Sequence, residues 1–318
     1  MSLRPAPTSL PLPPPPQVYE AYAVLMQQLD EHLVAQAGGR LLVVFSLSAA
    51  GIACAIAGCV AGLAVLLVEA EPEQTKQMLR LGLSDFVVSD LNEALQILKN
   101  QIRRAKPISV TLAAPPEPCA QQMVERGLQP EFIAGDWPQS AAPLLARGAV
   151  LLEARLPGQF PEQLPGQERL CVVWRQRMEG TMSSDRLLAQ VDALAMKVLE
   201  ESMADLSADA RASMPVDALA DALVDAPVDA AVGLSLAGQA PKQQGGGVQR
   251  EGLSDLDGRR QWLLRSPRYL GRRLGAEHCL HLRASELERL RALLEDNSEL
   301  AAQVELVVEP LGEKYLHR

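Results

Sequence analysis

The stretch at residues 38–68 constrains the fold more than any other part of the chain. An apolar run at 41–45 leads into small residues at 46–51, then an Ala-, Gly- and Cys-rich segment and a second apolar run at 64–68. A β-branched run bounded by glycine is typical of a buried parallel strand. Glu69 ends the second run, about twenty residues beyond the turn. This order predicts a nucleotide-binding βαβ unit, in which a helix N-terminus faces a phosphate and an acid binds a ribose hydroxyl.

The same stretch is long and apolar enough to raise a second interpretation, a membrane span with Arg40 and Glu69 as its first flanking charges. Gly and Ser residues interrupt it, and its β-branched residues cluster near its two ends. A strand, a turn, a helix and a second strand explain this pattern better than one unbroken helix does.

Alternating strands and helices continue to about residue 155. Apolar residues recur at helical spacing over 18–36, and Asp90 is an expected N-cap with Glu93 three residues later. This alternation predicts an α/β protein, with a Rossmann-like parallel sheet and helices on both faces over residues 17–155. Further strands are expected at 108–112, 131–134 and 149–153, and a short strand or a turn at 85–88. Further helices are expected at 71–81, 90–104, 117–126 and 140–147.

The segments around this domain differ from it in composition. Residues 1–16 are proline-rich and are expected to be disordered. Residues 156–205 are expected to form a helical extension. Residues 206–250, rich in Ala and Asp, are expected to form a flexible linker. Residues 251–318 are expected to form a small C-terminal α+β module.

The composition excludes several kinds of function. The net charge of −9 and the aromatic content of 3% disfavour general nucleic-acid binding. The five cysteines are scattered without a CxxC pair, which favours reduced thiols in the cytoplasm over a disulfide framework or a zinc site. His278 and His281 flank Cys279, but their three-residue spacing in an expected strand places them on opposite faces, so no metal site is predicted. No Ser/His/Asp or Cys/His arrangement can be assembled, and no catalytic residue is assigned.

The start of the tail is strongly basic, and a protein partner is expected to bind either there or at the proline-rich N-terminus. The acid-rich segment beside the basic residues offers another interpretation, neutralisation within the chain. Assembly into a homo-oligomer is left open. The basic residues are Arg259, Arg260, Arg265, Arg268, Arg272 and Arg273.

At residues 46–55 the sequence SLSAAGIACA resembles the strand-to-helix turn GLGGMGGAQP of urocanase (urocanate hydratase), whose Rossmann-like domain holds NAD⁺. The resemblance continues in register over roughly residues 17–150. Glu69 aligns with the acidic residue after the family's second strand, and DLNEAL at 90–95 aligns with its DLDEAL helix. The resemblance implies a Rossmann-like fold, NAD as the ancestral cofactor, and Gly51 and Glu69 as remnants of its site.

The turn departs from the family where the cofactor should bind. Only Gly51 remains of its glycines, and a side chain at each replaced position obstructs the approach of pyrophosphate to the backbone. Two further family segments, HGNAAE and TDQTSAHDP, are replaced by AAPPEP at 113–118 and AGDWPQSAA at 134–142. The residues that replace glycines are Ser46, Ser48, Ala49 and Ile52.

Two functions follow as hypotheses. The first is a degenerate urocanase-like protein without catalysis, which acts as a scaffold or interaction module and binds no cofactor. The alternative is a urocanate hydratase-type lyase that keeps NAD or another nucleotide at the turn from Ser46 to Gly51, where serine hydroxyls replace lost backbone donors. An acid such as Glu69, without a glycine cradle, is otherwise expected to be solvated.

Overall fold

The computed structural model describes residues 10–31, 38–152, 169–177, 183–212, 247–270 and 277–309. Its larger sheet has six parallel strands in the order β3-β4-β2-β1-β5-β6. The residues of β1 and nearly all of those of β2 are buried, as expected for central strands covered on both faces. The strands are β1 (Leu41–Phe45), β2 (Ala64–Glu69), β3 (Phe86–Val88), β4 (Ile108–Ala113), β5 (Phe132–Gly135) and β6 (Val150–Leu152).

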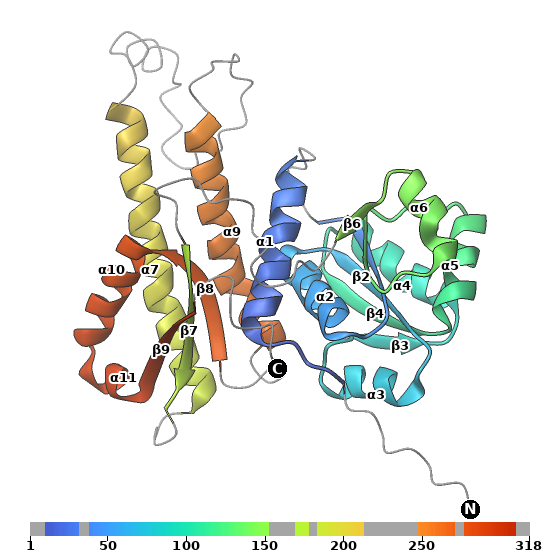
Figure 1. Cartoon of the computed structure of the whole chain (residues 1–318), viewed down its shortest axis with the longest axis horizontal. Helices are drawn as coiled ribbons and strands as arrows, with labels where there is room; N and C mark the ends of the chain where they lie inside the picture. The colour runs from blue at the N-terminus through green and yellow to red at the C-terminus, as the bar shows by residue number, and fades with distance from the viewer. Residues whose placement is uncertain are drawn as a thin grey trace, which may run out of the picture.

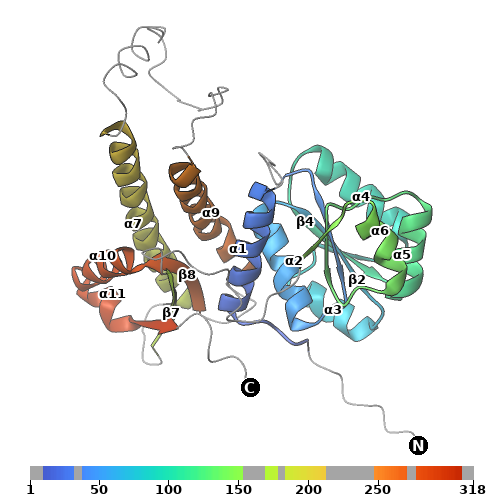
Figure 2. The same cartoon turned by 45° about the horizontal axis from the view of Figure 1, so that its top comes forward.

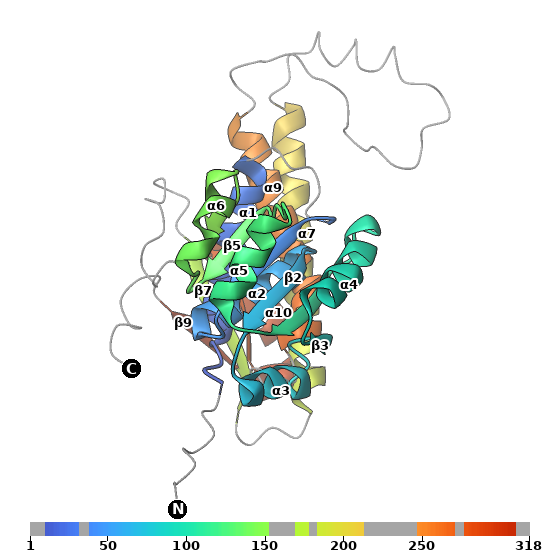
Figure 3. The same ribbon diagram turned by 90° about the vertical axis from the view of Figure 1, so that its right-hand side faces the viewer.

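Helices cover both faces of this sheet, which confirms the expected Rossmann-like architecture (Figure 1). Alternate residues of β1 enter two separate cores, with Leu42 and Val44 in one and Val43 and Phe45 in the other. The first core includes α1 and α2, and the second includes α4 and α5. In Figure 3, α4 and α5 lie with α6 on the face of the sheet that is turned toward the viewer. The helical elements are α1 (Pro15–Glu31), α2 (Ala49–Ala61), α3 (Pro72–Arg80), α4 (Leu91–Arg103), α5 (Pro116–Glu125), η1 (Gln139–Ala141) and α6 (Ala142–Ala146).

Local signals in the sequence determine several of these boundaries. The side chain of Asp90 accepts hydrogen bonds from the backbone N–H groups of Asn92 and Glu93, which makes Asp90 the expected N-cap of α4. Gly62 has a φ of 102° and ends α2, because a left-handed residue at this point closes the last turn. The stretch at 41–68 is therefore strand, helix and strand, as the residue pattern predicts.

The smaller sheet is antiparallel, with β7 (Arg169–Gln176) between β8 (Glu277–Arg283) and β9 (Val304–Glu309). The helices around it are α7 (Ser184–Ala212), α9 (Gly247–Leu270), α10 (Ala284–Glu295) and α11 (Ser298–Gln303). Because β7 pairs with both C-terminal strands, the expected helical extension and the expected C-terminal module form one unit. We call this the C-terminal unit.

Two further segment assignments need correction. Helix α7 continues to Ala212 and α9 starts at Gly247, so both ends of the expected linker at 206–250 are helical, and 213–246 lie outside the described residues. In the proline-rich segment, residues 1–9 also lie outside them, but Leu10 is buried and its N–H donates to Oε1 of Gln77 over 3.0 Å. Pro15 begins α1, because proline is well suited to the first turn of a helix.

Helix α2 joins the two parts of the molecule. Every residue from Gly51 to Ala61 is buried, because α1 and α9 cover the side of α2 that faces away from the sheet (Figure 2). The side-chain amide of Gln261 donates to the carbonyl of Ala61 over 3.0 Å, and Arg265 reaches the same carbonyl over 3.4 Å. These donors from α9 satisfy carbonyls that the end of a helix otherwise leaves without partners.

No helix in the described part of the chain is both long and apolar enough to cross a membrane. All five cysteines lie within the described ranges, are buried and form no disulfide. Burial raises the pKa of Cys54 to about 12, and it also raises that of Cys119 to about 12, against the opposing effect of Arg126. Thiols with such pKa values are poor nucleophiles at neutral pH.

Candidate functional site

The turn between β1 and α2 is closed by its own hydrogen bonds. Ser46 has a φ of 73°, in the left-handed region, and its N–H donates to the carbonyl of Val68 over 3.2 Å. Ser48 is the N-cap of α2, and its Oγ accepts the N–H of Gly51 over 3.2 Å. The serine hydroxyl therefore binds a backbone N–H that a phosphate would need.

Gly51 fits the turn because its backbone lies close to that of Ser46. A Cβ at position 51 would lie only 2.5 Å from the carbonyl oxygen of Ser46, too close for any side chain. The requirement for glycine at this position is therefore met by packing within the chain.

Glu69 is directed into the same turn. Its Oε2 accepts the N–H of Leu47 over 3.2 Å, and its Oε1 accepts the N–H of Glu71 over 2.9 Å. The carboxylate thus lies where β2 ends and binds a backbone donor of the turn before α2. The expectation of a simply solvated acid is therefore wrong.

Ile52 is fully buried, as its volume predicts. It belongs to the core that contains Val44 of β1 and Leu67 of β2, so it packs against the two central strands of the sheet. The start of the turn is more open, since Ser46, Ser48 and Ala49 are only partly buried.

The first of the two replaced family segments also contributes few donors. Helix α5 begins at Pro116 after Pro115, and no side chain caps its N-terminus. Neither proline has an N–H, so this helix offers fewer donors to an anion than an ordinary helix does.

The family model of the urocanase Rossmann-like domain matches residues 18–141. This segment is similar to a urocanase Rossmann-like domain, and it makes up less than half of the chain. The match runs from α1 to η1 and contains the whole β1–α2–β2 unit with its altered turn. The C-terminal unit lies outside it.

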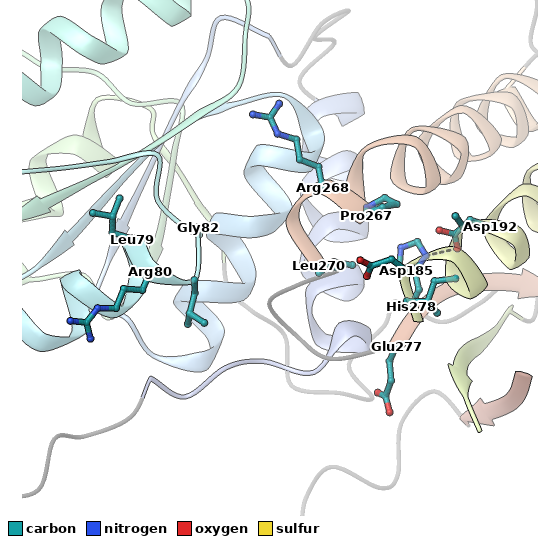
Figure 4. A pocket seen from close by; sticks show the side chains of 13 residues that line it. Leu79, Arg80, Gly82, Asp185, Asp192, Pro267, Arg268, Leu270, Glu277 and His278 are labelled. Carbon is teal, nitrogen blue, oxygen red and sulfur yellow. Dashed lines mark hydrogen bonds and ion pairs between the residues drawn. The ribbon is translucent and has the colours of Figure 1, made fainter. Parts of the chain in front are cut away.

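A pocket of about 590 Å³ lies between the urocanase-like domain and the C-terminal unit (Figure 4). The end of α3 contributes Leu79 to Gly82, and α7, α9 and β8 form the remaining walls. No local sequence pattern predicts this pocket, because its walls come from elements that are far apart in the chain.

A serine, a histidine and an aspartate form a buried chain beside this pocket. Nδ1 of His278 lies 2.6 Å from Oδ1 of Asp192, and Nε2 lies 2.6 Å from Oγ of Ser266. The same Asp192 oxygen accepts the indole N–H of Trp174 over 3.0 Å. Three residue types typical of nucleophilic catalysis are thus brought together, although the sequence did not predict it.

Ser266 is nevertheless not placed as an accessible nucleophile. It is fully buried, and its hydroxyl donates to the carbonyl of Trp262 over 2.6 Å, one turn earlier in α9. The next residue is Pro267, which has no N–H to stabilise an oxyanion. The chain of contacts joins β7, α7, α9 and β8, and this role is structural.

The basic residues at the start of the tail do not form one exposed cluster. Arg259 is buried, and its guanidinium lies 2.6 Å from a carboxylate oxygen of Glu286. Arg265 binds the end of α2, and Arg268 lines the pocket. Arg260 lies 3.9 Å from Glu200 on the surface, whereas Arg272 and Arg273 fall outside the described residues.

Among the residues that the structure describes, no group of three or more His, Cys, Asp or Glu side chains could hold a metal ion. His278 and His281 are both buried, and each has neighbours of its own. His278 contacts Asp192 and Ser266, while the ring of His281 lies 4.5 Å from that of Tyr19.

Proposed function

We propose that the urocanase-like domain is a non-catalytic scaffold whose cofactor turn has been closed. The observation that carries this proposal is the position of the Glu69 carboxylate. In a nucleotide-binding βαβ unit the acid after the second strand binds the ribose. Here both of its oxygens accept backbone N–H groups, from Leu47 in the turn and from Glu71.

This arrangement opposes a bound nucleotide in two ways. The carboxylate takes up the Leu47 N–H and places a negative charge beside the turn, where it repels a phosphate. The Ser48 side chain takes up the Gly51 N–H at the start of α2. In urocanase the nicotinamide supplies the covalent chemistry and the protein orients it, so a domain that cannot hold NAD lacks that reaction.

The burial of α2 supports the scaffold part of the proposal. A helix that is apolar on all sides must be covered on all sides. The sheet covers one side of α2, and α1 and α9 cover the rest, with Gln261 and Arg265 bonded to its last turn. The first partner that the scaffold holds is therefore the C-terminal unit of its own chain.

Replacing Glu69 tests both parts of this proposal. Glu69→Gln should lower the free energy of unfolding by about 1–2 kcal/mol, because a side-chain amide has one oxygen and cannot accept both N–H groups. Urea denaturation measures this loss, and titration calorimetry with NAD⁺ should show no binding at millimolar concentration in the wild type or the variant. An unchanged stability together with micromolar NAD⁺ binding in the wild type would show that Glu69 serves a ligand.

A further inference from the structure

We propose that the pocket between the urocanase-like domain and the C-terminal unit binds a small organic cation, a protonated amine carried on an apolar body. This site is separate from the β1–α2 turn and does not depend on the fate of NAD there. The hydrogen-bonding atoms of the pocket that have no partner determine which kind of ligand it can bind.

Helix α7 presents two acids to the pocket with apolar residues between them. Asp185, Leu188, Ala189 and Asp192 all line it, and their spacing of three, four and seven residues places them on one face of the helix. The two carboxylates are therefore two turns apart along a single wall.

Both acids keep open acceptor atoms. Asp192 is only 8% exposed, and its Oδ1 contacts Trp174 and His278, while Oδ2 has no partner among the described residues. Asp185 makes no hydrogen bond or ion pair within the described part of the chain. The third acid of the pocket, Glu277, lies 3.6 Å from Arg175 and is already compensated.

Neither arginine near the pocket compensates Asp185, whereas Asp192 already pairs through Oδ1 with the ring of His278. Figure 4 shows the side chains of Arg80 and Arg268 pointing away from Asp185, Asp192 and His278. Both ring nitrogens of His278 are directed to Ser266 and Asp192, so this histidine has no N–H left for a ligand. An incoming ammonium group would supply the missing donors and the missing positive charge.

The remaining walls suit a hydrocarbon body. Leu79 and Leu81 come from one side, and Leu188, Pro267 and Leu270 from the other. A volume of about 590 Å³ is within the range for small-molecule sites, which occur preferentially where two units meet. A ligand here would contact α3 of the urocanase-like domain and three elements of the C-terminal unit.

Three probes of the same shape and different charge test this proposal on the full chain. They are cyclohexylmethylamine, cyclohexylmethanol and cyclohexanecarboxylate, and saturation-transfer NMR measures the dissociation constant of each. The amine should bind at millimolar concentration or below, and the alcohol about tenfold more weakly, because a hydrogen bond to a charged group is worth more than a neutral one. The carboxylate should bind most weakly.

Three variants locate the site. Asp185→Asn should remove most of the preference for the amine, and it should fold because Asp185 is exposed. Ala189→Trp should fill the pocket and abolish binding of all three probes. Glu201→Gln, a matched change of an exposed acid on α7 away from the pocket, should leave binding unchanged.

The proposal is wrong if the alcohol or the carboxylate binds as tightly as the amine, or if no probe binds. Retention of amine binding by Ala189→Trp would also overturn it, since the amine would then occupy another place. None of these outcomes involves NAD, so the scaffold proposal is tested separately.

Discussion

Glu286→Leu should lower the free energy of unfolding by about 3 kcal/mol, the lower end of the cost of breaking a buried ion pair, because Asp255 lies 3.1 Å from Nε of Arg259 and still compensates part of its charge. Arg259 and Glu286 are each only 2% exposed, and Arg259 also donates to the carbonyl of His281 over 3.1 Å. The pair therefore joins α9, β8 and α10. Urea denaturation followed by circular dichroism measures the loss.

A double variant distinguishes the free energy lost with a charge partner from the free energy lost with packing contacts. Arg259→Met combined with Glu286→Leu removes both charges, and it should be more stable than Arg259→Met alone, which leaves the buried Glu286 without its partner. If the losses in the free energy of unfolding of the two single variants add up to the loss of the double variant, Arg259 and Glu286 do not stabilise each other as their geometry indicates.

The pair should also make stability depend on pH. Burial opposes ionisation of Glu286, but the hydrogen bonds and charge of Arg259 outweigh it and hold the pKa of Glu286 below its ordinary value of 4.5. A lowered folded-state pKa stabilises the protein above the unfolded-state pKa, and this stabilisation is lost as the pH falls through the folded-state value. The stability difference between the wild type and Glu286→Leu should therefore shrink in acid.

Restoring the family glycines at the turn should lower the free energy of unfolding by about 4–6 kcal/mol and should not restore NAD⁺ binding. The variant carries Ser46→Gly, Ser48→Gly, Ala49→Gly and Ile52→Gly. Most of the loss comes from Ile52, because deleting a buried aliphatic side chain and placing glycine in a helix both destabilise. Binding should not return because Glu69 still occupies the turn and the other two family segments are replaced.

Ser46→Gly alone is the matched control for this variant. Ser46 has a φ of 73°, so glycine at this position should raise the free energy of unfolding by about 0.5–1 kcal/mol instead of lowering it. A quadruple variant that binds NAD⁺ at micromolar concentration with unchanged stability would contradict the account of a filled-in site.

The parallel sheet could be predicted from the sequence because its signals are local. The β1–α2–β2 order appears in a single stretch of apolar and small residues, and Asp90 marks the start of α4 within four residues. Each strand of a parallel sheet is buried on both faces and therefore appears in the sequence as a run of apolar residues.

The C-terminal unit could not be predicted in the same way, because its contacts join distant segments. Trp174 pairs with His278 across more than a hundred residues, and β7 alone looks like an isolated strand. The contact of Asp192 with His278 spans 86 positions, so no spacing rule brings these residues together. The spacing in HCLH argues against a metal site, but it does not show that His278 contacts a carboxylate and a hydroxyl.

Glu69 illustrates a limit of motif reasoning within the well-predicted domain. Its position after β2 follows from the sequence, but the direction of its carboxylate does not. An acid at that position can bind a ribose, face solvent or bond to the neighbouring turn, and only the backbone N–H of Leu47, 3.2 Å away, distinguishes these roles.

The cofactor content of the purified wild-type protein tests the central claim most directly. A tightly held NAD⁺ should copurify, so the protein is denatured and the released nicotinamide nucleotide is measured against protein concentration. The account of a closed turn predicts no NAD⁺ above the background of a control protein. Release of one NAD⁺ per chain would contradict it and would favour a nucleotide-binding enzyme of the urocanate hydratase type.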